Sequence, residues 1–97
     1  WAGLFVNLDA QLDFSSQTSI KLMVWAPDTG QFRLKLENQA TPSQFIEVDQ
    51  SVTVAQAWTE LTFDLTGAST LYDRVVIFPG WNVSNAGTFY VDNIKQD

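Results

Sequence analysis

The stretch Ala57-Trp58-Thr59-Glu60-Leu61-Thr62-Phe63-Asp64-Leu65 decides the fold class of this chain. Within it, Leu61, Phe63 and Leu65 alternate strictly with polar residues. A period of two is typical of a β-strand that has one buried face and one solvated face. The turn-forming residues 66–69 end the stretch. We therefore expect residues 58–65 to form a central strand of an antiparallel β-sandwich.

The other apolar runs of the chain also have strand character, and no window keeps a helical period for three turns. The run Val75-Val76-Ile77-Phe78 is apolar on both faces, which indicates a strand whose outer face is also covered or is used for binding. The sequence thus predicts an all-β domain, with further strands at residues 3–9, 18–26, 31–38, 45–54, 71–79 and 88–95.

The segments 18–26 and 31–38 predict a β-hairpin, because the turn-forming residues Pro27-Asp28-Thr29-Gly30 join them. Matching the apolar faces of the two strands fixes the register. That register places Trp25 opposite Arg33 on the outer face, where an indole and a guanidinium attract each other.

Composition excludes several classes of function. The 97 residues carry 11 acidic and 5 basic side chains, a net charge of −6, which argues against nucleic acid and anionic membrane as partners. The chain has no Cys and no His, so thiol chemistry, a Ser-His-Asp triad and most zinc sites are ruled out. Its length suits one domain, and no apolar run is long enough to span a membrane.

Four segments, in order, carry a family resemblance that covers nearly the whole chain. Trp58-Thr59-Glu60-Leu61-Thr62-Phe63-Asp64-Leu65 resembles the "W-E-T-L-T-F-D-F" strand of carbohydrate-binding modules of the family 4/9 type. Lys21-Leu22-Met23-Val24-Trp25-Ala26-Pro27 is similar to their "K-V-W-S-P" motif, and Phe32-Arg33-Leu34-Lys35-Leu36-Glu37-Asn38 to their "V-x-L-K-L-E-N" motif. Thr88-Phe89-Tyr90-Val91-Asp92-Asn93-Ile94 is similar to their closing "F-Y-F-D-D-I", with Asn93 in place of the second acid.

The resemblance implies a jelly-roll, galactose-binding-domain-like fold and a function. Such modules are non-catalytic and hold a secreted glycoside hydrolase on a polysaccharide, here with a β-glucan such as laminarin favoured. Residues 1–97 would be one domain, the C-terminal two-thirds of the full module, completed by an N-terminal segment and linked covalently to a catalytic domain. The resemblance also makes Asp92 a ligand of a structural Ca²⁺, whereas a solvated Asp is the plainer alternative.

The candidate sugar-binding residues combine aromatic platforms with hydrogen-bond donors, because sugars offer apolar C–H faces and a rim of hydroxyls. Trp25 and Arg33 lead this set, although a covering loop over Trp25 is an equal alternative. Trp81 lies in a Gly- and Asn-rich loop, where an indole needs either packing or a ligand. Trp58, by contrast, is expected in the core. By strand parity, the outer face of Arg33 would also carry Asn7, Arg74 and Phe78.

Two other classes of function remain open at this point. A structural or protein-interaction sandwich would show a broad, flat apolar patch on the Trp25 face, whereas a sugar site would be a groove with a polar rim. Catalysis is the weaker option, because a glycosidase needs a specific pair of carboxylates and nothing in the sequence singles one out. The identity of the sugar, and whether it binds along a chain or at a chain end, are not encoded in these motifs.

Overall fold

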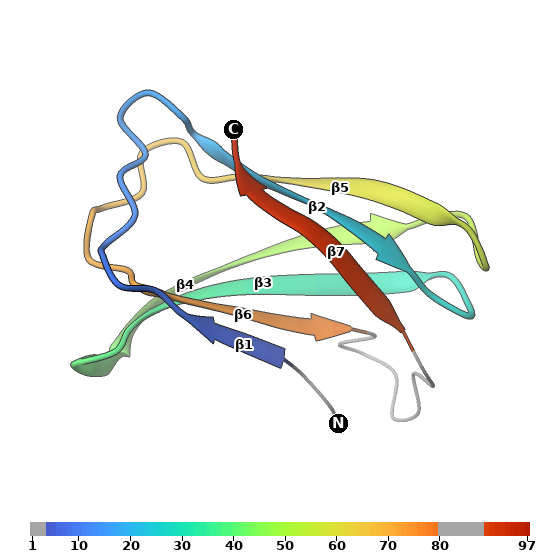
Figure 1. Cartoon of the computed structure of the whole chain (residues 1–97), viewed down its shortest axis with the longest axis horizontal. Coiled ribbons are helices and arrows are strands. Elements are labelled where there is room, and N and C mark those ends of the chain that lie inside the picture. Colours follow the sequence, from blue (N-terminus) through green and yellow to red (C-terminus); the bar gives the residue numbers. More distant parts are fainter. Residues whose placement is uncertain (1–3, 80–88) are drawn as a thin grey trace.

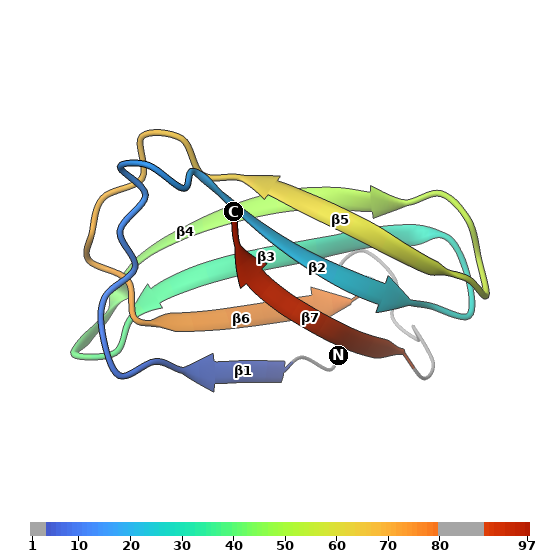
Figure 2. The same cartoon turned by 45° about the horizontal axis from the view of Figure 1, so that its top comes forward.

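The computed structural model describes residues 4–79 and 89–97 of the chain, and these residues form an all-β domain. Figures 1 and 2 show two layers of strands, one crossing in front of the other. No helix in the described ranges is long and apolar enough to cross a membrane. The strands are β1 (Leu4–Asn7), β2 (Ser19–Trp25), β3 (Gly30–Asn38), β4 (Thr41–Val52), β5 (Trp58–Asp64), β6 (Arg74–Pro79) and β7 (Tyr90–Gln96).

Every strand pair among the described residues is antiparallel, and the pairs form two sheets. The sheet that we call sheet A has the strand order β1-β6-β3-β4, and sheet B has the order β5-β2-β7. In Figure 2 the strands of sheet A lie side by side behind the three strands of sheet B. The predicted antiparallel β-sandwich is therefore confirmed.

The core lies between the two sheets and follows the alternation read from the sequence. Every second residue of β2 and β3 is buried, and Val24, Leu34 and Phe63 have no accessible surface. Strands from both sheets supply this one cluster, and Phe14 and Tyr72 close it from the connecting segments. The two dry faces meet because only this packing removes both from water.

The predicted hairpin of residues 18–26 and 31–38 is wrong. β2 pairs with β5 and β7, and β3 pairs with β4 and β6, so the Pro27–Gly30 segment crosses from one sheet to the other. The apolar faces of β2 and β3 do meet, but across the core rather than side by side. Trp25 and Arg33 consequently lie on opposite outer faces of the sandwich, not next to each other.

The actual hairpin joins β3 to β4 through the two-residue turn Gln39–Ala40. β4 begins earlier than expected, at Thr41, and it includes Pro42. β4 is an edge strand, which accommodates a residue without a backbone N–H. The pairing of β3 with β4 shifts register between Glu37 and Asn38, whereas residues 45–52 of β4 pair without interruption.

The strand of residues 58–65 is not central, because β5 is an edge strand of sheet B. At the opposite edges, Val6 on β1 and Ile94 on β7 have the parity of core residues but are 43% and 40% exposed. Among the described residues, the core is therefore incompletely covered on the side between β1 and β7. That an additional N-terminal segment completes the sandwich stays a prediction.

Candidate functional site

Arg33 is held by acidic neighbours on the outer face of sheet A. Its Nε and Nη2 donate to the two carboxylate oxygens of Asp49 at 2.7 and 3.0 Å, and its Nη1 lies 3.6 Å from Glu47. These hydrogen bonds lower the pKa of the Asp49 carboxyl below its usual value. A two-pronged Arg–carboxylate pair fixes the guanidinium in one orientation. This geometry stabilises the sheet and ties up the donors that a sugar was expected to use.

The other predicted residues of that face do lie with Arg33. Phe78 is its register partner on β6 and is buried, and Arg74 follows on the same strand face. Arg74 donates to the Asn7 amide oxygen at 2.7 Å and lies 3.5 Å from Glu37. The predicted shared face of Asn7, Arg33, Arg74 and Phe78 is confirmed, but Arg33 and Arg74 are paired with Asp49, Glu37 and Asn7 of the same sheet. Trp25 does not belong to it.

Trp25 lies instead in the middle of an aromatic row on the outer face of sheet B. Its register partners are Trp58 on β5 and Tyr90 on β7. The rings of Trp25 and Tyr90 are 5.6 Å apart and tilted by 59°. Trp58 and Tyr90 are 51% and 55% exposed, whereas Trp25 is half-buried between them. We call these three residues the aromatic platform.

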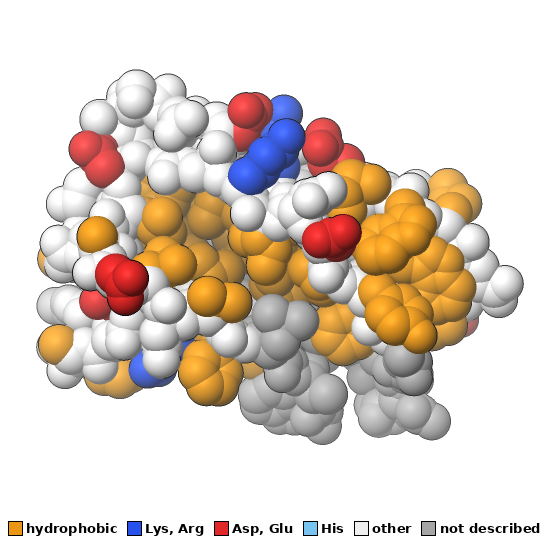
Figure 3. Space-filling model, viewed as in Figure 1, with side chains coloured by type: hydrophobic (Ala, Val, Ile, Leu, Met, Phe, Trp, Pro, Cys, Tyr) orange, Lys and Arg blue, Asp and Glu red, His pale blue; other side chains and the backbone are white. Residues whose placement is uncertain are grey.

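Figure 3 shows a hydrophobic patch on the right of the view, over the end of β2 and the beginnings of β5 and β7. These strand ends carry the platform residues. Strands in a sheet are about 4.8 Å apart, so the two outer rings are centred roughly 10 Å from each other. The platform therefore extends across the strands far enough to contact more than one small ring.

A second row of side chains runs beside the platform. Met23 is two residues from Trp25 on the same face, and its register partners are Glu60 and Asp92. Both carboxylates are exposed, and acidic side chains border the patch in Figure 3. The face thus combines flat apolar surface with oxygen acceptors about 7 Å away along the strands. It suits a ligand that has an apolar face and a rim of hydroxyl donors.

Trp58 and Tyr90 are functional candidates that the sequence reasoning missed. The expectation that Trp58 packs in the core is wrong, and the correct signal was present in the alternation itself. Trp58 has the parity of Glu60 and Asp64, not that of the buried Leu61. Parity equally places Tyr90 with Asp92, opposite the inward Val91. What parity could not show is that β5 and β7 flank β2.

The calcium site that the resemblance implied stays a prediction, with Asp92 as its expected ligand. Asp92 is exposed on sheet B, and its carboxylate accepts a hydrogen bond from the Asn93 backbone N–H at 2.8 Å. Calcium requires six to eight oxygen ligands. In residues 4–79 and 89–97, no three His, Cys, Asp or Glu residues are grouped so that they could hold a metal. Trp81, the remaining sugar-binding candidate, lies outside the described residues.

No protein-family model matches this chain, and a search of curated proteins found no match.

Proposed function

We propose that this protein is a non-catalytic carbohydrate-binding domain that binds a polysaccharide through the aromatic platform. The observation that carries the proposal is the row Trp58–Trp25–Tyr90, exposed on the outer face of sheet B next to Glu60 and Asp92. Aromatic rings stack on the C–H faces of sugars, and carboxylates accept hydrogen bonds from hydroxyls. In its proposed setting, the domain acts outside the cell and keeps a covalently attached hydrolase near its substrate.

The direction of the platform supports a chain as the ligand. Three rings in register across three strands form a line perpendicular to the strands. A sugar chain lying along that line stacks on Trp58 and Tyr90 with different rings, while its hydroxyl edge faces Glu60 and Asp92. Weak stacking on several rings adds up to useful affinity when the sugars belong to one chain.

The carboxylates next to the platform support an uncharged glycan as the ligand. Glu60 and Asp92 flank the platform, and the whole chain has a net charge of −6. A polyuronate or sulfated glycan would bring like charges close to both carboxylates. We therefore expect neutral β-glucans such as laminarin to bind and polygalacturonate to be excluded.

Affinity electrophoresis tests the proposal. The parent should be retarded in gels that contain laminarin, barley β-glucan or xylan, and the double variant Trp58→Ala/Tyr90→Ala should run as in a gel without polysaccharide. Phe45→Ala is the matched control, because Phe45 is 44% exposed but lies on sheet A. The proposal would be refuted if the parent is not retarded in any of these gels, or if Phe45→Ala loses retardation as fully as the double variant does.

The alternative function, a protein-interaction sandwich, also draws on the exposed aromatic row. It predicts a larger apolar surface than three rings bordered by carboxylates, because a stable interface buries about 800 Å² on each partner. Hydrolysis is a third possibility, but a glycosidase needs an enclosed, partly apolar site for its general acid. Glu60 and Asp92 are both exposed. Release of reducing sugar by the isolated chain would show catalysis directly.

A further inference from the structure

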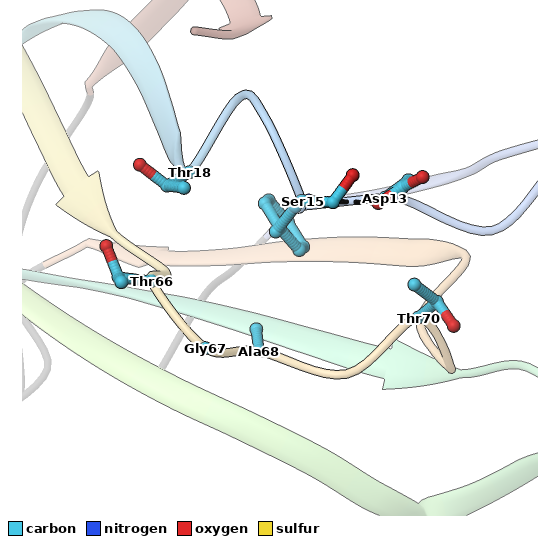
Figure 4. A pocket seen from close by; sticks show the side chains of 8 residues that line it. Asp13, Ser15, Thr18, Thr66, Gly67, Ala68 and Thr70 are labelled. Carbon is cyan, nitrogen blue, oxygen red and sulfur yellow. Dashed lines mark hydrogen bonds between the residues drawn. The ribbon is translucent and has the colours of Figure 1, made fainter.

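A hollow of about 350 Å³ lies at the other end of the sandwich from the aromatic platform. Eight residues line it, four from the segment 13–18 before β2 and four from the segment 66–70 after β5. Figure 4 shows side chains of both segments around this space. Thr18 immediately precedes β2 and Trp25 ends it, seven residues further along the chain, which in a strand is roughly 23 Å. We call this space the end hollow, and it is separate from the platform.

Five of the eight residues that line the end hollow carry a side-chain oxygen. Four hydroxyl side chains line it, those of Ser15, Thr18, Thr66 and Thr70, together with the carboxylate of Asp13. Phe14, which is 3% exposed and anchored in the core, and Ala68 add apolar surface. Hydroxyls both donate and accept hydrogen bonds. Such a lining matches a ligand with several hydroxyls and some C–H surface.

Hydrogen bonds hold both walls of the hollow in place. The Leu65 N–H donates to the Thr18 carbonyl at 2.8 Å and joins the two segments. The Gln96 amide donates to the carbonyls of Asp13 and Gln17, which ties the first wall to β7. The second wall turns at Gly67, whose φ of +83° suits glycine. A site with walls fixed in advance loses little entropy when a ligand binds.

The charge of Asp13 disfavours anionic ligands in the end hollow. The Ser15 backbone N–H donates to the Asp13 carboxylate at 2.9 Å, and this bond lowers the pKa of Asp13. Asp13 therefore stays ionised and repels anions, and no Lys or Arg lines the hollow in the described ranges. The volume is near the lower end of small-ligand sites, about 300–1,000 Å³, so it fits a single ring rather than a chain.

We propose that the end hollow is a second binding site, for one neutral polyhydroxylated ring such as a pyranose. The site does not depend on the platform, so it could take a free monosaccharide or the terminal ring of a glycan. Its occupant is bound by hydroxyl-to-hydroxyl hydrogen bonds and by contact with Phe14 and Ala68. A stacked aromatic ring is not required.

Amide NMR spectra of the full chain test this site, with glucose, galactose and mannose as probes at millimolar concentration. At least one sugar should shift the backbone amides of residues 13–18 and 65–70, and glucuronate should shift none of them. Thr70→Val keeps the side-chain shape but removes a hydroxyl, and should weaken binding roughly three- to tenfold. Ser69→Ala is the control, since Ser69 is the exposed neighbour that does not line the hollow.

The same spectra separate this proposal from the function of the platform. Binding at the hollow should survive in Trp58→Ala/Tyr90→Ala, and polysaccharide retardation should survive in Thr70→Val. The proposal is overturned if no sugar shifts the hollow amides, if the shifts map only to the platform, or if Thr70→Val binds like the parent. Equal binding of glucuronate would also overturn it, because the ionised Asp13 could not then be at the site.

Discussion

Replacing Trp58 by Ala removes one end of the aromatic platform, and the structure gives a size for the effect. An indole side chain offers about 200 Å², and 51% exposure leaves about 100 Å² accessible. A sugar stacked on one face covers about half of that, or about 50 Å². At about 25 cal/mol per Å², this contact contributes about 1.3 kcal/mol, which is roughly a ninefold change in Kd.

Calorimetric titration with laminarin, or with whichever neutral glycan retards the parent most, measures this change. Tyr90→Ala should lose a similar amount, because Tyr90 is exposed to a similar extent. Trp58 and Tyr90 are separated by the strand of Trp25, so the losses should add to roughly eightyfold in the double variant.

The fold should survive these substitutions, since half-exposed residues on edge strands cost about 1 kcal/mol or less of stability. Thermal melts by circular dichroism check that point. If Trp58→Ala folds normally and binds the glycan as tightly as the parent, the platform is not the binding face and the reasoning is wrong.

Further substitutions test the fold itself. Leu34 on β3 is fully buried, so Leu34→Ala leaves a cavity in the core and should lower the free energy of unfolding in urea titrations by about 3–4 kcal/mol. A loss below about 1 kcal/mol would contradict the packing described. Asp49→Asn should cost about 1 kcal/mol at neutral pH. The pKa of Asp49 is lower in the folded state than its unfolded value of 3.8. The stabilisation from the Asp49–Arg33 pair is therefore complete above the unfolded pKa and is lost as the pH falls through the folded pKa. The melting temperatures of parent and variant should converge in acid. Asn93 has a φ of +53°, so Asn93→Val should cost about 1–2 kcal/mol and Asn93→Gly little; equal melts for both would show that this left-handed backbone conformation is not held. Trp25→Ala and Arg33→Ala should have additive effects on stability, whereas a coupling above about 0.5 kcal/mol would place them side by side.

The resemblance and the structure bear on function in different ways. The four motifs gave the expectation of a sugar-binding module, and the aromatic platform supplies a physical reason for proposing it. The sequence placed the expected ligand on the Arg33 face, which is the outer face of sheet A. Arg33 and Arg74 are engaged with Asp49, Glu37 and Asn7, so the proposed ligand contacts move to sheet B.

The sequence by itself determined the strands and their faces. Alternation is a property of each strand alone, since neighbouring side chains must point to opposite sides of a sheet. Leu61 and Phe63 could be assigned to the core from the sequence, and Asn7, Arg33 and Arg74 to an outer face, without any knowledge of partners. Parity even placed Trp58 outside, although its size suggested the core.

Only the tertiary structure decided which strands are neighbours. β2 and β3 have matching apolar faces, and such faces can be buried either side by side in one sheet or opposite each other across a core. Both arrangements satisfy the same alternation, and the difference lies in hydrogen bonds between segments far apart in the sequence. Because β2 pairs with β5 and β7 instead of β3, Trp25 lies between Trp58 and Tyr90 and away from Arg33. The platform exists through those long-range pairings, which no local pattern in the chain records.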